Sequence, residues 1–210
     1  MRILSHRGYW IAADEKNTPE AFARSAEAGF GTETDVRDRN GRLVISHDPA
    51  SEDSVEIDQM LAAFRSKRLP LAINIKADGL SGLLLEKMRD CGIEWFAFDM
   101  SGPELHRYLA AGLPCYTRQS DIEPEPICYE RCLGVWLDSF AGPEWFDASL
   151  ISAHLDAGKR VCVVSSELHG RSHAPLWRML KDSGVSNRDG LDLCTDIPED
   201  AQSFFMAGEG

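Results

Sequence analysis

Short apolar runs alternate with helical stretches along most of this 210-residue chain, and this alternation limits its possible folds more than any other feature. Short apolar runs bounded by turn residues are typical of buried strands, whereas apolar residues three or four positions apart are typical of amphipathic helices. The pattern predicts strands at residues 2–6, 32–36, 43–46, 71–75, 95–98, 114–117, 135–137, 160–164 and 191–195. It predicts helices at residues 18–28, 81–91, 103–111, 145–157 and 174–183.

One turn decides how these strands are connected. Asn40 and Gly41 stand between the strands predicted at 32–36 and 43–46, and an Asn-Gly pair in such a place is a strong signal for a tight hairpin. The 43–46 strand is then the returning arm of a hairpin, which leaves eight strands of the βα type. Eight such units predict a TIM-like (β/α)8 barrel, formed as one compact α/β domain over residues 1–210, with an open doubly wound sheet as the alternative.

The charge balance and the apolar pattern exclude several classes of partner. Acidic residues outnumber basic ones by 34 to 22, and the resulting charge of −12 argues against binding to nucleic acid or to an anionic membrane. No apolar run approaches the roughly 20 residues that span a bilayer, and the chain enters a polar motif after two apolar residues. We therefore expect a cytoplasmic protein without stable membrane insertion, whose cysteines are reduced.

A barrel of this kind carries its chemistry at the carboxyl ends of its strands and in the loops that follow them. Polar and charged residues of this sequence occupy many of these positions, so we expect their side chains to meet at one rim of the barrel. They are His6 and Arg7 at the first strand, Glu33 and Asp35 at the second, Asn74 and Lys76 at the third, and then Asp99, Arg118, Asp138, Glu167, His169 and Asp196.

Glu33 and Asp35 are the candidate metal ligands. They are two residues apart in a strand, so their side chains point to the same face. Two adjacent carboxylates are costly unless a cation or a shared proton relieves their repulsion. A hard divalent ion such as Mg²⁺ or Ca²⁺ is the simplest relief. The alternative is that the two acids form salt bridges with Arg7, Arg37 and Lys76.

Two histidines are candidates for acid–base catalysis. His6 ends the first strand, and His47 follows the hairpin arm and precedes Asp48. An imidazole titrates near neutral pH, so one ring can act as a general base and the other as a general acid, with Asp48 orienting the second ring. Either histidine alone would more commonly be structural, but beside the carboxylate pair the two indicate catalysis.

The remaining candidates are substrate-binding residues. Arg7 and Lys76 supply the positive charge that a phosphoryl group needs as its negative charge grows in the transition state, although Lys76 can also pair with Glu33. Asn17 precedes Thr-Pro and either contacts the substrate or serves as a turn residue. Glu167 lies in the polar loop at 165–173, where it either contacts the substrate or a metal ion, or faces solvent.

A set of motifs occurs in order along the chain: His6-Arg7-Gly8, Asn17-Thr18-Pro19-Glu20-Ala21-Phe22, Glu33-Thr34-Asp35-Val36, Asn40-Gly41, Val44-Ile45-Ser46-His47-Asp48, Asn74-Ile75-Lys76 and Thr195-Asp196-Ile197-Pro198. With these motifs the chain resembles the glycerophosphodiester phosphodiesterase family, part of the phosphodiesterase TIM-like barrels. The resemblance implies such a barrel and metal-dependent cleavage of a phosphodiester. It implies roles for His6 and His47 as the acid–base pair, Glu33 and Asp35 as metal ligands, and Arg7 and Lys76 as phosphate ligands.

Three departures from the family pattern bear on this chemistry. Lys16 stands where the family usually has a glutamate before Asn-Thr. Asn74 replaces the glutamate of the family's Glu-x-Lys motif, so a neutral carbonyl takes the place of an anionic metal ligand. The segment that covers the substrate in the family is reduced here to residues 49–68. We therefore expect Asn74 to serve as the third ligand of Mg²⁺ or Ca²⁺, and the affinity for the metal to be lower.

The function predicted from these residues is the metal-dependent hydrolysis of a small-molecule phosphodiester of the glycerophosphodiester kind. One histidine deprotonates water or a neighbouring hydroxyl, and the other protonates the departing alkoxide. Two alternatives are left open by the sequence. One is a barrel that binds a phosphorylated small molecule without cleaving it, with Lys16 as a fixed cation, and the other is a lyase that releases a cyclic phosphate.

Overall fold

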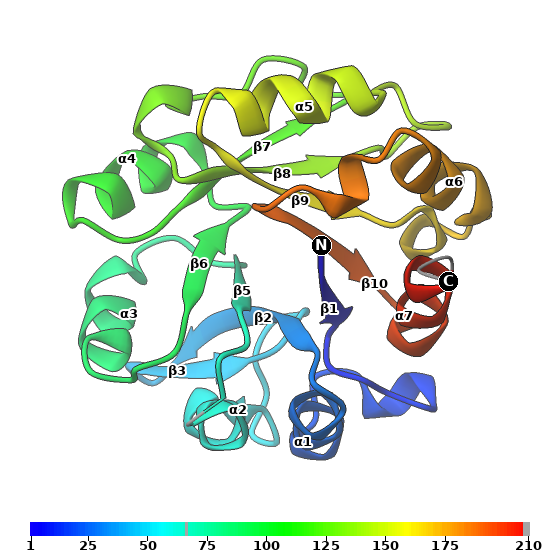
Figure 1. The fold of residues 1–210 in the computed structure, drawn as a ribbon. Coiled ribbons are helices and arrows are strands. Elements are labelled where there is room, and N and C mark those ends of the chain that lie inside the picture. Colours follow the sequence, from blue (N-terminus) through cyan, green and yellow to red (C-terminus); the bar gives the residue numbers. More distant parts are fainter. Residues whose placement is uncertain (66, 208–210) are drawn as a thin grey trace.

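The computed structural model describes residues 1–65 and 67–207. Within these residues, eight parallel strands form a closed ring that is surrounded by helices (Figure 1). The ring consists of β1 (Arg2–His6), β2 (Gly31–Arg39), β5 (Leu71–Ile75), β6 (Trp95–Phe98), β7 (Tyr116–Ser120), β8 (Gly134–Asp138), β9 (Arg160–Val164) and β10 (Leu191–Thr195). The short strands β3 (Arg42–Ile45) and β4 (Val55–Glu56) continue from β2 as an antiparallel extension outside the ring.

The ring closes by the pairing of the first and last strands. β1 pairs in parallel with β10 on one side and with β2 on the other, and β2 pairs in parallel with β5. The seam between β6 and β7 is held, in the described part of the chain, by one bridge between Ala97 and Cys115. The predicted TIM-like barrel is therefore confirmed, and the open doubly wound alternative is wrong.

The helix α1 begins and ends at residues that local sequence signals predict. Thr18 accepts a hydrogen bond from the Ala21 amide at 3.3 Å and so caps α1, and Gly29 ends this helix with a φ of 83°.

None of the described helices combines the length and the apolar character needed to cross a bilayer. The helices are α1 (Pro19–Ala28), α2 (Ile57–Phe64), α3 (Ser81–Met88), α4 (Gly102–Ala110), α5 (Ala148–Asp156), α6 (Ala174–Asp182) and α7 (Pro198–Met206).

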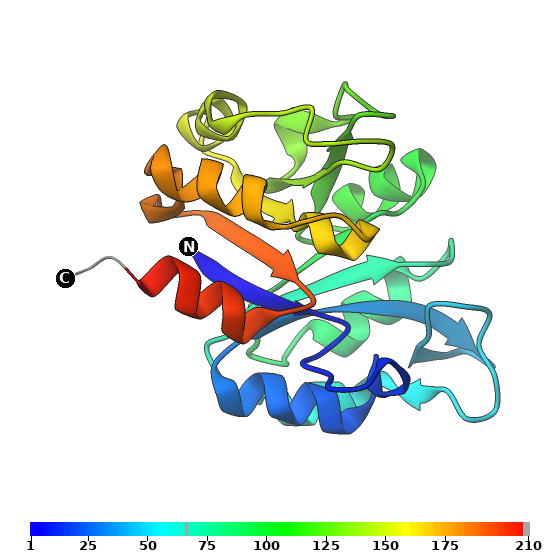
Figure 2. The ribbon, with the colours of Figure 1, turned by 90° about the vertical axis from the view of Figure 1, so that its right-hand side faces the viewer.

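Aromatic side chains fill the inside of the ring. Phe96 stacks on Tyr116 with 3.7 Å between ring centroids, and Phe98 stacks on Trp136 at 3.8 Å. All four rings are buried. Because this interior is packed, the chemistry of the molecule is confined to the rim. In the side view of Figure 2, the arrowheads of β1 (dark blue), β2 (blue) and β10 (orange) point to the same end of the barrel.

The structure departs from the predicted elements at several positions. β2 ends at Arg39 rather than at 36, α3 ends at Met88 rather than at 91, and α5 begins at Ala148 rather than at 145. The 49–68 segment, expected only as a reduced covering loop, contains β4 and α2, whose apolar residues such as Met60 and Phe64 are fully buried. The strand predicted at 114–117 is instead β7, which begins two residues later. The helix α7 was not predicted, although Pro198 at its first turn is a recognised start signal.

Candidate active site

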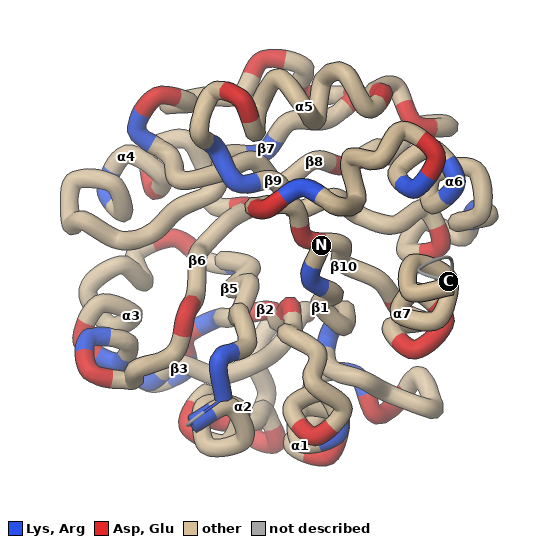
Figure 3. Tube along the Cα trace, in the orientation of Figure 1, with Lys and Arg blue, Asp and Glu red and all other residues tan. Residues whose placement is uncertain are grey.

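The rim of the barrel brings together side chains from three neighbouring strands. In the parallel register, His6 of β1 lies beside Glu33 of β2, and Asp35 of β2 lies beside Asn74 of β5. Glu33 and Asp35 are separated by one residue, so both side chains face the inside of the ring. Lysine, arginine and acidic residues occur close together around β1 and β2 (Figure 3).

Asp35 is fully buried and is surrounded by donors and positive charge. Arg7 Nε lies 2.9 Å from Asp35 Oδ2, and Lys76 Nζ lies 3.4 Å from Asp35 Oδ1. Asn17 Nδ2 donates a hydrogen bond to Asp35 Oδ2 at 3.0 Å, so this amide supports the acid. The salt bridges considered from the sequence are thus present at Asp35, and Lys76 contacts this residue rather than Glu33.

Glu33 has much less compensation for its burial. Its side chain is 2% exposed, accepts a hydrogen bond from the Arg7 amide at 3.2 Å and lies 3.8 Å from His6 Nε2. Burial, together with the neighbouring charge of Asp35, raises the pKa of Glu33 to about 8. At neutral pH this carboxyl therefore retains a proton unless a cation lies beside it.

Within the described residues, Asn74 Oδ1 is buried without a hydrogen-bond partner, and Asp35 Oδ1 accepts no hydrogen bond and has only the ion pair with Lys76 at 3.4 Å. A buried acceptor without a hydrogen bond is costly. Together with the Glu33 carboxyl, these atoms form a set of oxygen donors of the kind that Mg²⁺ and Ca²⁺ prefer. In residues 1–65 and 67–207, no group of three or more His, Cys, Asp or Glu side chains is placed to hold a metal ion. A cation at Glu33 and Asp35 would therefore need a ligand of another type, and the amide of Asn74 is the candidate. The donors present fit a hard divalent cation.

His6 is oriented by the last strand of the barrel. Its Nδ1 lies 2.7 Å from Asp196 Oδ1, just beyond the end of β10. A carboxylate only accepts hydrogen bonds, so Nδ1 carries the proton and Nε2, which faces Glu33, has a free lone pair. Burial lowers the pKa of His6 against the opposing effect of Asp196. Burial is the largest single effect on the pKa of Asp196 and raises it, but the hydrogen bond and charge of His6 together with Lys16 outweigh burial and keep this pKa below its ordinary value.

His47 lies in the loop that follows β3 and is more exposed than His6. Its side chain is 47% exposed, and its Nδ1 lies 3.2 Å from Asp48 Oδ1. Its backbone carbonyl accepts a hydrogen bond from Arg37 Nη2 at 3.0 Å. Arg37 therefore fixes the loop that carries His47 rather than pairing with the carboxylates of β2.

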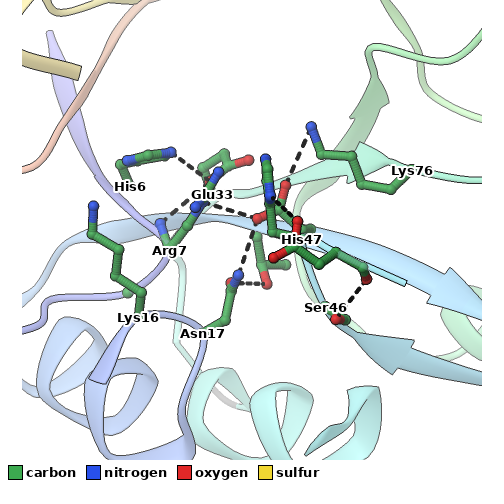
Figure 4. Close-up of polar contacts among 12 residues, drawn as sticks. His6, Arg7, Lys16, Asn17, Glu33, Ser46, His47 and Lys76 are labelled. Carbon is green, nitrogen blue, oxygen red and sulfur yellow. Dashed lines mark hydrogen bonds and ion pairs between the residues drawn. The ribbon is translucent and has the colours of Figure 1, made fainter. Parts of the chain in front are cut away.

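A cavity of about 390 Å³ joins His47 to the residues around Asp35. Its lining includes His47, Arg7, Lys16 and Asn17. Figure 4 shows His6 and His47 on either side of Arg7, with Lys16 at the His6 flank. His6, His47, Lys16 and Asn17 therefore lie around Arg7, although they come from distant parts of the chain. Asp138 and His169, which were expected at the same rim, contact each other at 2.7 Å.

Asp196 and Lys16 lie beside His6, although Asp196 was predicted only as a rim residue and Lys16 only as the fixed cation of the non-cleaving alternative. Lys16 Nζ lies 3.6 Å from Asp196 Oδ2 and 4.3 Å from the centre of the Trp10 ring. The signal for Asp196 was its position after the last strand, because a closed barrel places the last strand beside the first, where His6 lies. The hydrogen bond between Asp196 and His6 depends on the closure of the barrel and not on local sequence.

Glu167 lies in the loop after β9, as the sequence predicted, and its carboxylate is held by neighbouring donors. Its two carboxylate oxygens accept hydrogen bonds from Ser165 and Thr195, and from the Asp196 amide at 3.1 Å. Within the described residues, its carboxylate forms no hydrogen bond with Asn74 and none with Glu33 or Asp35. Glu167 thus ties the loop after β9 to the end of β10 and supports the residue that orients His6.

Gly8 permits the close approach of the first loop to α1. Its φ is 84°, and a Cβ at this position would lie 2.7 Å from Ala21 Cβ. We expect Gly8→Ala to lower the free energy of unfolding by about 2 kcal/mol, because it combines backbone strain with a steric clash. Urea denaturation measures this effect. Gly142→Ala is the control, since its φ is ordinary and its Cβ would meet nothing within 4 Å, and equal stability of the two variants would contradict the expectation.

Comparison with known proteins supports the fold. No family model and no curated protein sequence matches the chain. A solved glycerophosphodiester phosphodiesterase from Parabacteroides distasonis matches with a TM-score of 0.63 at 18% identity, over 97% of this chain and 96% of that one. An Oleispira antarctica phosphodiesterase in complex with the product sn-glycerol-3-phosphate matches with a TM-score of 0.69 at 15% identity, over the same shares of the two chains.

A more distant barrel also matches. A Ca²⁺-dependent phosphatidylinositol-specific phospholipase C from Streptomyces antibioticus has a TM-score of 0.58 at 9% identity, over 98% of this chain and 96% of that one. The chain therefore has the fold of the phosphodiesterase barrels. The resemblance inferred from the motifs to the glycerophosphodiester phosphodiesterases is confirmed at the level of fold.

Proposed function

We propose that this protein is a phosphodiesterase that hydrolyses a glycerophosphodiester-like small molecule with the aid of a divalent cation. The observation that carries the proposal is the group of oxygen donors on Glu33, Asp35 and Asn74, with a histidine on either side of Arg7. The shared fold supports it, because one structural neighbour holds sn-glycerol-3-phosphate as its product.

Glu33, Asp35 and Asn74 are the residues that would hold Mg²⁺ or Ca²⁺. When bound, the cation supplies positive charge that stabilises the phosphate and permits both acids to be ionised. Arg7 and Lys76 lie within 3.4 Å of Asp35 and would contact the remaining phosphate oxygens. Asn17 keeps Asp35 in position through its hydrogen bond.

In the proposed reaction, His6 is the general base and His47 the general acid. His6 suits the first role because burial keeps the ring neutral and Asp196 fixes the tautomer in which Nε2 is free. His6 Nε2 takes a proton from the attacking water. His47, in the cavity that Arg7 also lines, delivers a proton to the departing alkoxide. Glu167 supports this arrangement indirectly through the Asp196 amide.

The dependence on a cation is tested with bis-p-nitrophenyl phosphate as a chromogenic substrate. We expect hydrolysis with Mg²⁺, Ca²⁺ or Mn²⁺ and a decrease of about a hundredfold after treatment with a chelator, reversed by adding the ion back. Full activity in excess chelator would contradict the role of the cation. Calorimetric titration with the same ions provides a second measurement, in which Glu33→Gln is expected to abolish binding.

A further inference from the structure

The seam between β6 and β7 is the weakest joint of the barrel and has a cavity beside it. One bridge, between Ala97 and Cys115, joins these strands in the described residues, whereas β5 and β6 pair over four residues. The cavity has a volume of about 650 Å³, larger than the cavity of about 390 Å³ at His47. This volume lies within the range of about 300–1,000 Å³ that is typical of sites for organic ligands.

Thr117 gives this seam cavity an unsatisfied polar group. The residue lines the cavity, its side chain is 1% exposed, and its hydroxyl has no hydrogen-bond partner in residues 1–65 and 67–207. A buried hydroxyl is stabilised when it finds a partner. A ligand oxygen inside the cavity would provide one.

The seam cavity adjoins the proposed phosphate site through a single side chain. Asp99 lines the cavity and lies at the end of β6 in a left-handed conformation with a φ of 69°. Its Oδ2 is 3.9 Å from Lys76 Nζ, and Lys76 in turn contacts Asp35. Asp99 also forms an ion pair with Arg118 across the mouth of the cavity. A molecule whose phosphate contacts Lys76 could therefore extend past Asp99 into the seam.

The lining of the cavity defines the kind of group that fits it. Leu105 and the 52% exposed Ile127 contribute apolar surface. The acids Asp99, Glu123 and Glu125 outnumber the single lining cation, Arg118, so a second anionic group is disfavoured. An uncharged chain with an apolar body and a hydrogen-bonding oxygen matches both the apolar surface and the Thr117 hydroxyl.

We propose that the seam cavity binds one alcohol arm of the phosphodiester, and that this arm is an uncharged, largely apolar chain that carries an oxygen atom. This inference rests on the proposed function, because the phosphate of the same molecule is held at Arg7 and Lys76. It assigns to the site a substrate longer than a simple glycerol diester. The alcohol arm would pass Asp99 and lie against Leu105 and Ile127.

The test compares alkyl phosphates of different length by calorimetry in the presence of Mg²⁺. Wild-type protein is expected to bind hexyl phosphate at least about tenfold more tightly than methyl phosphate, because the added methylene groups are buried. Ile127→Trp fills the cavity and is expected to reduce this preference to within about twofold. Ile122→Trp is the matched control, since Ile122 is an exposed isoleucine that does not line the cavity, and it should keep the preference.

The proposed contact between the Thr117 hydroxyl and the oxygen atom of the alcohol arm is tested with Thr117→Val. This substitution removes the hydroxyl and keeps the shape of the side chain. This variant is expected to bind 2-propoxyethyl phosphate about fivefold more weakly than wild type and to bind hexyl phosphate equally well. Equal binding of methyl and hexyl phosphate to wild type, or equal effects of the two tryptophan variants, would overturn the proposal while leaving the phosphate site intact. If methyl phosphate itself fails to bind, the phosphate site is contradicted and this proposal falls with it.

Discussion

Replacing His6 or His47 by alanine is expected to lower kcat for a phosphodiester by about a thousandfold in either variant. Each substitution removes one of the two proton transfers, and general acid–base catalysis commonly contributes about 10²–10⁴ to a rate. KM should change little, because neither imidazole is proposed to hold the phosphate. Steady-state kinetics with bis-p-nitrophenyl phosphate and saturating Mg²⁺ measures both quantities.

The control for this experiment is His106→Ala, which removes an exposed histidine of α4 far from the rim motifs in sequence. Its kcat should match that of wild type. Metal binding by the His6→Ala and His47→Ala proteins should also be retained, which separates a loss of proton transfer from a collapse of the site. If neither His6→Ala nor His47→Ala lowers the rate, the two-histidine mechanism is rejected.

Replacing Glu33 by glutamine is expected to abolish activity and, at the same time, to stabilise the metal-free protein at alkaline pH. The pKa of Glu33 is raised to about 8 in the fold, above an ordinary value of 4.5, so the folded protein holds this proton more tightly than the unfolded chain. The associated stability is fully present below pH 4.5 and is lost as the pH rises toward 8. Glutamine is neutral at every pH, so the Glu33→Gln protein does not lose this stability as the pH rises.

Thermal and urea denaturation at pH 5 and pH 8, without divalent ions, measure this effect. At pH 8 we expect Glu33→Gln to be more stable than wild type by on the order of 2 kcal/mol, with a much smaller difference at pH 5. Added Mg²⁺ or Ca²⁺ should stabilise wild type and not the variant. Glu27→Gln, on the exposed face of α1, is the control for loss of one negative charge. A destabilised Glu33→Gln protein at pH 8 would show that Glu33 is ionised and already compensated.

The strands and the hairpin were predictable because their signals are local. The apolar runs at β5, β6, β9 and β10 end at polar residues, and Asn40 and Gly41 both adopt the positive φ values that a tight hairpin requires. β4 and α2 were missed because β4 has only two residues and the helix begins without a side-chain cap. The helix did carry a local signal, since Ile57, Met60, Leu61 and Phe64 have the spacing that is typical of an amphipathic helix.

The sequence predicted which residues lie at the site better than it predicted which of them contact one another. Residues at strand ends must share a rim in a barrel, so His6, Glu33 and Asp35 were placed together from their positions alone. Which partner each one contacts depends on register and loop conformation. Lys76 therefore contacts Asp35 and Asp99 rather than Glu33, and Glu167 contacts the Asp196 amide.

Phosphorus NMR of a glycerophosphodiester incubated with the purified protein and Mg²⁺ shows directly whether this rim cleaves a phosphodiester by hydrolysis. We expect the diester resonance to be replaced by that of a phosphomonoester with wild-type protein and to persist with Glu33→Gln. Accumulation of a cyclic phosphate would contradict hydrolysis in favour of a lyase, and an unchanged diester with Mg²⁺, Ca²⁺ and Mn²⁺ alike would contradict the phosphodiesterase assignment itself.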